Sequence, residues 1–388
     1  MPTDAIQVEG VGPEKVKRAI EDAITSGAEL GLHVAAYHRG ELVIDAWAGT
    51  ADARTGAPVR ADTLFNVYSV TKAVTATALH IQAERGLVDY DAPMARYWPE
   101  FAAHGKEGVT VRHALTHRAG VPQMPEGVTP ERMCDWTWMA GAIADLEPLA
   151  PPGRHTLYQS MTFGWLIGEI VRRTDPARRD FRQFVLDELC APLGLKDLWI
   201  GIPESAEPRV AIMDLRTEGR GPPPAATLYA RSLPESVALT PRVFEQSAVR
   251  RACIPGVGGI FNARDEARFW AMLAEGGSLD GARLLSNERV KSFSTMRDNG
   301  DELDPVFFGV PIPISIGGYW LGGDRVSGPR AIWHPGAGGS IGWADPERRL
   351  AVAICHNRMF DAVFPGDQDP ILPISRAIMT SLDLGQVT

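Results

Sequence analysis

The sequence predicts an α+β protein in which strands from both ends of the chain form one antiparallel sheet, flanked by helices. Strand-like runs lie near both termini, whereas the middle of the chain has helical spacing broken by Gly and Pro. The 388 residues also exceed what one compact core usually holds. We therefore expect a sheet domain of residues 1–68 and 256–388, with residues 69–255 inserted as a helical domain.

The N-terminal part predicts one helix followed by a β-hairpin. Pro13 and Glu14 are favourable entry residues for a helix, and apolar residues follow at helical spacing as far as Gly27. The runs 32–37 and 42–48 are strand-like and are joined at Arg39-Gly40.

The C-terminal part mirrors this arrangement. Two short strands, 343–344 and 350–355, flank the turn sequence 345–348, and a final helix is expected over 371–382. Before them, Asn262 together with Asp265 is expected to cap a helix that runs through Leu273.

Prolines crowd residues 201–255, within the predicted helical domain. Long Pro-rich connections often serve as lids or binding loops, so this segment is expected to shape a substrate pocket. The alternative is a surface excursion far from any site.

Composition and charge exclude several classes of function. The formal net charge is −9 and there is no basic run, which argues against nucleic acid and anionic membranes as partners. The N-terminus lacks the pattern of a secretory signal, so a cytoplasmic protein is expected. The four cysteines are scattered, which predicts free thiols and neither a zinc site nor a redox pair. No cofactor is expected.

The strongest chemical motif is Ser69-Val70-Thr71-Lys72, which precedes an apolar helix over 73–84. A serine in the first helical turn lies near the positive end of the helix dipole. Lys72, three residues later, lies on the same face and can reach it. A lysine shielded from water can lose its proton and then activate the serine. Alone the spacing is weak, because a helix cap followed by a surface lysine has the same pattern.

Two further motifs strengthen this interpretation. Tyr158-Gln159-Ser160 precedes a helix over 162–172, where a tyrosine can direct its phenol into a site. The glycine-rich run 334–339, His-Pro-Gly-Ala-Gly-Gly, lies just before the C-terminal strands and can offer backbone N–H groups to an oxyanion.

In this order the three motifs resemble the serine β-lactamase and penicillin-recognising superfamily, on its class C side. The segments 115–120, 191–195 and 255–259 also match recurrent stretches of the family, so the resemblance covers nearly the whole chain. It implies a β-lactamase/transpeptidase-like fold with the site between sheet and helical domain. It further implies that Ser69 is the nucleophile, that Lys72 and Tyr158 share the base and acid roles, and that the amides of Ser69 and Ala337 form the oxyanion hole.

The departures from the class C pattern concern the substrate-binding positions Ser160, His334 and Gly336. Class C β-lactamases usually have Asn at the position of Ser160, and Lys-Thr-Gly where this chain has His334-Pro335-Gly336. In this respect the chain resembles the family VIII carboxylesterases. A serine carboxylesterase acting on small esters is therefore expected, with β-lactamase, D-amino-acid amidase or peptidase, and acyltransferase as alternatives.

Three other interpretations are less favoured. Residues 338–342 match the Gly-x-Ser-x-Gly nucleophile elbow around Ser340, but a turn and a strand are expected after it, where that motif needs a helix. His113 and His117 lie one helical turn apart, but no glutamate follows His113 and no third ligand is evident. A binding protein without turnover would be expected to lack the lysine or the tyrosine, and both are present.

Overall fold

The computed structural model describes residues 8–216, 226–323, 326–360 and 371–384. Its main sheet has the strand order β1-β3-β2-β16-β15-β14-β13, with β4 paired to β3, and every pairing in it is antiparallel. The strands are β1 (Glu9–Val11), β2 (Gly31–His38), β3 (Glu41–Asp52), β4 (Ala57–Pro58), β13 (Trp320–Leu321), β14 (Ile332–Pro335), β15 (Ile341–Asp345) and β16 (Leu350–His356). The predicted fold class is thus confirmed.

The two ends of the chain meet at the pairing of β2 with β16, where His38 lies opposite Leu350 and Leu32 opposite His356. The turn between β2 and β3 is formed by Arg39 and Gly40, whose φ angles of 54° and 82° suit the twist of a two-residue hairpin. The predicted N-terminal hairpin is confirmed.

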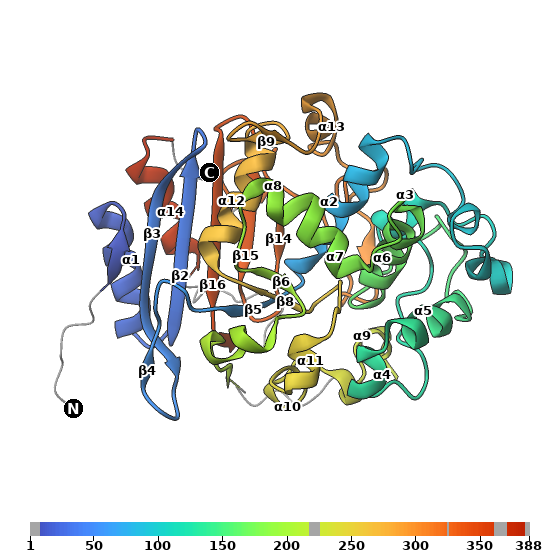
Figure 1. Cartoon of the computed structure of the whole chain (residues 1–388), viewed down its shortest axis with the longest axis horizontal. Helices are drawn as coiled ribbons and strands as arrows, with labels where there is room; N and C mark the ends of the chain where they lie inside the picture. The colour runs from blue at the N-terminus through green and yellow to red at the C-terminus, as the bar shows by residue number, and fades with distance from the viewer. Residues whose placement is uncertain (1–7, 217–225, 324–325, 361–370, 385–388) are drawn as a thin grey trace.

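Helices cover both faces of this sheet (Figure 1). Helices α1 (Glu14–Thr25) and α14 (Ile371–Ser381) pack together on one face, and α12 (Ala263–Ala274) lies on the other against β2, β15 and β16. Because both faces are covered, seven of the eight residues of β2 are buried, which accounts for its nearly continuous apolar sequence. All three helices were expected.

The cap of α12 differs in part from the prediction. Asn262 accepts a hydrogen bond from the amide of Arg264 at 3.0 Å, as expected of a cap. The expectation for Asp265 was wrong, because its carboxylate instead accepts from the amides of Lys196 and Asp197 at 2.5 and 2.6 Å. Asp265 therefore holds a neighbouring loop.

Residues 71–195 contain helices and no strand, and this stretch is described throughout. Helix α2 (Thr71–Glu84) packs against α6 (Thr162–Thr174), and Figure 1 shows this region to one side of the sheet. The other elements of this stretch are η1 (Met94–Arg96), η2 (Pro99–Gly105), α3 (Val111–Leu115), α4 (Pro130–Cys134), α5 (Trp136–Ala144), α7 (Phe181–Val185), η3 (Leu186–Cys190) and α8 (Ala191–Leu193). The domain boundaries given above stay a prediction.

A second, three-stranded antiparallel sheet joins the two regions. It has the order β5-β8-β6 and consists of β5 (Phe65–Tyr68), β6 (Leu198–Ile200) and β8 (Gly259–Phe261). Since β5 ends at Tyr68, it delivers the chain directly to Ser69.

The Pro-rich segment folds into short elements, and residues 217–225 of the predicted lid lie outside the described residues. The elements are η4 (Glu204–Arg209), β7 (Asp214–Arg216), α9 (Leu228–Ser232), η5 (Glu235–Val237), α10 (Pro241–Phe244) and α11 (Ser247–Arg251). The remaining elements of the C-terminal part are β9 (Ser278–Leu279), β10 (Ala282–Arg283), α13 (Asn287–Ser292), β11 (Leu303–Asp304), β12 (Val310–Pro311) and β17 (Arg358–Phe360).

Candidate active site

Ser69 lies in the tight turn between β5 and α2. The preceding residue, Tyr68, is buried and has a φ of 46°, a left-handed conformation that non-glycine residues rarely adopt. Two contacts hold it there: its hydroxyl donates to Met213 Sδ at 2.7 Å, and the Thr71 hydroxyl donates to its carbonyl. The strained turn therefore fixes the position of the serine.

The side-chain nitrogen of Lys72 contacts three oxygens. Nζ lies 2.9 Å from Ser69 Oγ, 2.7 Å from the Ser160 carbonyl and 2.9 Å from the Gly256 carbonyl. Lys72 is fully buried, and this burial lowers its pKa well below that of an exposed lysine. A neutral amine has two N–H groups, which the two carbonyls can accept, so its lone pair is left for the Ser69 hydroxyl proton.

Tyr158 lies in the loop before α6 and also reaches the serine. Burial raises the pKa of its phenol, and a hydrogen bond with the Ser69 side chain opposes that rise. Lys72 Nζ is 5.2 Å from the centre of the Tyr158 ring, and the ring centre of His117 is 4.5 Å away. The structure thus brings Ser69, Lys72 and Tyr158 together around one hydroxyl.

The glycine-rich loop after β14 approaches this group closely. A Cβ on Gly336 would lie 2.3 Å from the carbonyl oxygen of Val67 in β5, so only glycine fits there. Within the part of the chain that the structure describes, the amides of Ser69 and Ala337 donate no hydrogen bond. Both can thus donate to an oxyanion, the role that the resemblance implies for them and that stays a prediction.

The predicted substrate-binding positions Ser160 and His334 are engaged within the protein. Ser160 Oγ lies 2.9 Å from Ser232 Oγ of α9. His334 is fully buried, its Nδ1 lies 2.8 Å from the Pro335 carbonyl, and burial lowers the pKa of its ring to about 3. A neutral imidazole stands where the class C pattern has a lysine, and whether His334, Ser160 and Gly336 bind substrate stays a prediction.

The two alternative sites considered above, a nucleophile elbow at Ser340 and a metal site at His117, lack the surroundings that these functions require. Ser340 is buried and is followed by strand β15, not by the helix of a nucleophile elbow. His117 Nδ1 accepts from the Gln159 amide, and the described residues contain no group of three side chains that could hold a metal ion.

The four cysteines have free thiols, as expected. No helix among the described residues is long and apolar enough to cross a membrane.

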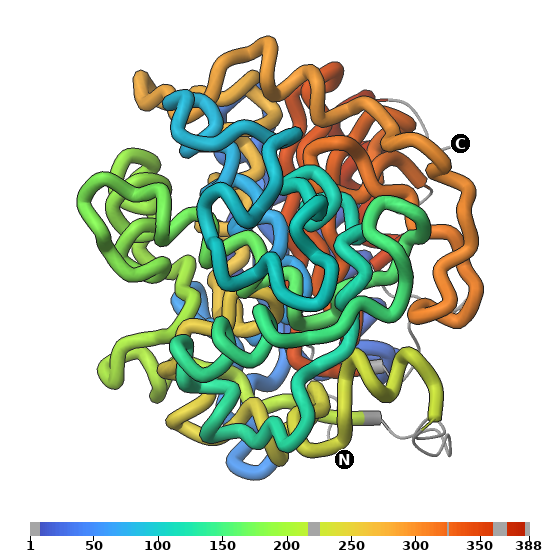
Figure 2. The backbone as a smooth tube through the Cα atoms, turned by 90° about the vertical axis from the view of Figure 1, so that its right-hand side faces the viewer, coloured from blue at the N-terminus to red at the C-terminus, as the bar shows by residue number. Residues whose placement is uncertain are grey.

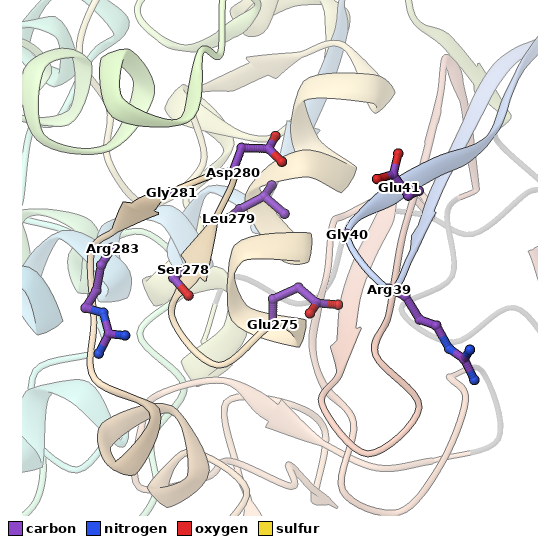
Figure 3. A pocket seen from close by; sticks show the side chains of 9 residues that line it. All are labelled: Arg39, Gly40, Glu41, Glu275, Ser278, Leu279, Asp280, Gly281 and Arg283. Carbon is purple, nitrogen blue, oxygen red and sulfur yellow. The ribbon is translucent and has the colours of Figure 1, made fainter.

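Two surface cavities lie away from Ser69. The first is lined by charged residues of the β2–β3 turn and of the segment after α12, including Arg39, Glu41 and Asp280 (Figure 3). The second lies between β3 and the Pro-rich segment and includes Arg60 and Arg250. Neither contains a residue of the Ser69 group.

Several residues of the site carried no signal in the sequence. Asp304 accepts a hydrogen bond from the Tyr158 amide at 2.7 Å, the Phe307 ring centre is 5.4 Å from that of Tyr158, and Ser232 contacts Ser160. None of the three belongs to a motif, and each comes from a distant part of the chain.

A family model described as Beta-lactamase matches residues 16–372 of the chain. The chain belongs to the beta-lactamase family. The resemblance inferred from the motifs is therefore confirmed. Among the curated proteins, the chain is 33% identical over 354 residues to Esterase/beta-lactamase LipL of Mycobacterium tuberculosis, covering 87% of this chain and 79% of that one.

Two solved structures have the same fold as this member of the beta-lactamase family. A family VIII carboxylesterase is 32% identical, with a TM-score of 0.85 and coverage of 95% of this chain and 99% of that one. A penicillin-binding protein homologue from Caulobacter crescentus is also 32% identical, with a TM-score of 0.85 and coverage of 97% and 100%.

Proposed function

We propose that the protein is a serine carboxylesterase that hydrolyses small carboxylic esters through an acyl-enzyme on Ser69. The observation that carries this proposal is the setting of the Lys72 amine. Burial lowers the pKa of this amine, and in its neutral form the two N–H groups can donate to the Ser160 and Gly256 carbonyls while the lone pair faces Ser69 Oγ. The relatives named esterase and carboxylesterase support the choice of ester as substrate.

In the first half-reaction, Ser69 Oγ bonds to the acyl carbon while its proton passes to the Lys72–Tyr158 pair. The negative charge that develops on the carbonyl oxygen is stabilised by the amides of Ser69 and Ala337. The bond to the leaving oxygen then breaks, and the alcohol departs with the proton that the pair returns. Water repeats the sequence on the acyl-enzyme, which releases the acid and restores Ser69.

Tyr158 is suited to pass the proton on toward the leaving oxygen. Its phenol has a raised pKa, so it stays protonated at neutral pH and can donate. Lys72 lies close to the same ring, and both side chains contact the Ser69 hydroxyl, so a proton taken from Ser69 can pass between them at that oxygen. The two side chains therefore act as one acid–base unit.

We expect esters to be better substrates than β-lactams because the motif His334-Pro335-Gly336 lacks a cation. The pKa of His334, lowered to about 3 by burial, leaves its imidazole neutral, and Pro335 supplies no hydroxyl. A β-lactam acid would find neither the positive charge nor the hydroxyl that the class C motif provides. A small neutral ester needs only the nucleophile and the oxyanion donors.

β-Lactamase activity is the second candidate, because LipL is named both esterase and beta-lactamase. The test is to measure kcat/KM side by side on p-nitrophenyl butyrate and on nitrocefin, with Ser69→Ala as the matched background control. We expect the ester to be favoured by at least about 100-fold. Equal values on the two substrates would favour the β-lactamase, and turnover of neither would reject both.

A further inference from the structure

The loop that carries Tyr158 is held by four consecutive backbone amides. The amide of Thr156 donates to Glu302 Oε2 at 3.1 Å, and that of Tyr158 donates to Asp304 Oδ2 at 2.7 Å. The two amides that alternate with them donate to His117, Leu157 to its carbonyl at 2.9 Å and Gln159 to its Nδ1 at 3.1 Å. Each of these four amides therefore has a partner from another segment of the chain.

The two carboxylates come from one short segment that lies far from Tyr158 in sequence. Glu302 directly precedes β11 and Asp304 is its last residue, and each is 146 residues from its amide partner. In Figure 2 the orange segment around residue 300 passes beside the green segment around residue 155. The contact therefore joins the C-terminal part of the chain to the loop before α6.

Both carboxylate oxygens of Asp304 accept hydrogen bonds from backbone amides. It is fully buried, and its Oδ1 accepts from the amides of Val306 and Phe307 at 2.8 and 3.2 Å. These bonds turn the chain so that the Phe307 ring packs edge-on against the Tyr158 ring at 5.4 Å. One carboxylate thus fixes both the backbone of Tyr158 and a side chain against its ring.

Glu302, whose side chain is partly exposed, holds the residues just before Tyr158. Its Oε2 also accepts from the Thr156 hydroxyl at 2.8 Å and from Arg118 Nη1 at 2.8 Å, and Oε1 lies 3.0 Å from His155 Nδ1. Arg118 in turn donates to the Gly153 carbonyl at 2.6 Å. The stretch before Tyr158 is therefore tied at 153, 155 and 156.

We propose that Glu302 and Asp304 are positioning residues that clamp the Tyr158 loop, so that the Tyr158 hydroxyl is aligned with Ser69. This inference rests on the proposed function, because it takes Tyr158 to move a proton. A phenol shifted by about 1 Å can cost on the order of 100-fold in rate while leaving substrate binding intact. Neither carboxylate contacts the Ser69 hydroxyl, so both act through Tyr158.

The decisive variant is Asp304→Asn. Both carboxylate oxygens face backbone N–H groups, so an amide of the same shape must place its NH₂ against at least one of them. We expect kcat on p-nitrophenyl butyrate to fall about 10- to 100-fold, with KM changed less than about twofold. The matched control is Asp265→Asn, because Asp265 also accepts two backbone amides from a distant loop, and that loop, at residues 196 and 197, does not carry Tyr158. The control should keep kcat within about twofold.

A double-mutant cycle with Tyr158→Phe separates positioning from general destabilisation. If the clamp acts through the phenol, Asp304→Asn causes no further loss of kcat once the phenol is gone. An equal loss in both backgrounds, or a normal kcat for Asp304→Asn, overturns the clamp and leaves the proposed function standing. Full activity of Tyr158→Phe overturns the role of Tyr158 in the proposed function, and the clamp with it.

Glu302→Ala is the second variant, used if Asp304→Asn does not fold. The substitution removes the carboxylate that accepts from the Thr156 amide. Because the Glu302 side chain is partly exposed, we expect the fold to survive its loss. Its loss of kcat, expected at about 5- to 10-fold, should also vanish in the Tyr158→Phe background. A loss that persists there overturns the clamp.

Discussion

Lys72 Nζ lies 2.9 Å from Ser69 Oγ, and the carbonyls of Ser160 and Gly256 can accept hydrogen bonds from the same nitrogen. An ammonium ion can donate to all three oxygens, whereas a neutral amine donates to the two carbonyls and accepts from the Ser69 hydroxyl, so the same positions serve both charge states. Burial of Lys72 favours the neutral amine, since it lowers the pKa of the side chain. The contacts therefore place the nitrogen beside the serine hydroxyl, and burial provides the charge state that can accept its proton.

Lys72 and Tyr158 should behave as one unit in catalysis. We expect Lys72→Met and Tyr158→Phe each to lower kcat/KM by at least about 100-fold, and the double variant to lose little more than either single one. The measurement is a double-mutant cycle on p-nitrophenyl butyrate, with circular dichroism to check the fold. Losses that multiply would show two independent roles.

Activity should decline toward acid pH as Lys72 takes up a proton. Because its pKa is lowered, the neutral amine persists to a lower pH than for an exposed lysine, and protonation below that pKa removes the acceptor for the Ser69 proton. Lys72→Arg keeps a cation that does not deprotonate, so it should be inactive over the whole range. The check is kcat/KM between roughly pH 5 and 10. An active Lys72→Arg enzyme with the same profile would contradict the role of Lys72 as a base.

Gly336→Ala should displace the loop that carries Ala337. The added Cβ would lie 2.3 Å from the Val67 carbonyl, which cannot move without disturbing β5. Loss of one aligned oxyanion donor costs about 100- to 1000-fold in kcat, so a fall of that size is expected. Gly108→Ala is the matched control, because a Cβ there meets nothing within 4 Å. Similar rates for the two variants would remove Ala337 from the oxyanion hole.

The local parts of the site could be predicted from the sequence, and the long-range parts could not. Ser69 and Lys72 lie three residues apart at the start of one helix, so the spacing alone brings them together. The contacts of Tyr158 with Asp304 and of Ser160 with Ser232 span 146 and 72 residues. Such contacts depend on how the elements pack, and no pattern in the sequence records that packing.

The same difference applies to the fold. The hairpin at Arg39-Gly40 and the helices beginning at Glu14 and Thr162 follow from local signals and are confirmed. The cap predicted for Asp265 is wrong because a place in the first helical turn does not decide the partner of the side chain, and folding puts this carboxylate beside residues 196 and 197. Local rules identify the element, and tertiary contacts decide which polar group its side chain serves.

The Pro-rich segment should influence which acyl chains are accepted. Tyr229 in α9 lies against Phe308, with ring centres 4.8 Å apart, and Ser232 in the same helix contacts Ser160. We expect Tyr229→Ala to change the ratio of kcat/KM for p-nitrophenyl octanoate to that for the acetate by about 5-fold or more. Leu42→Ala, an exposed apolar residue in β3, is the control. An unaltered ratio in Tyr229→Ala would place α9 outside the substrate pocket.

The central claim is that the acyl group is carried by Ser69, and covalent labelling tests it most directly. The protein is treated with a p-nitrophenyl alkylphosphonate, digested, and examined by mass spectrometry, with Ser69→Ala and Ser340→Ala treated in parallel. We expect one phosphonate on the peptide that contains Ser69, unchanged labelling in Ser340→Ala, and neither label nor esterase activity in Ser69→Ala. A label on Ser340, or an active and labelled Ser69→Ala protein, would contradict the central claim.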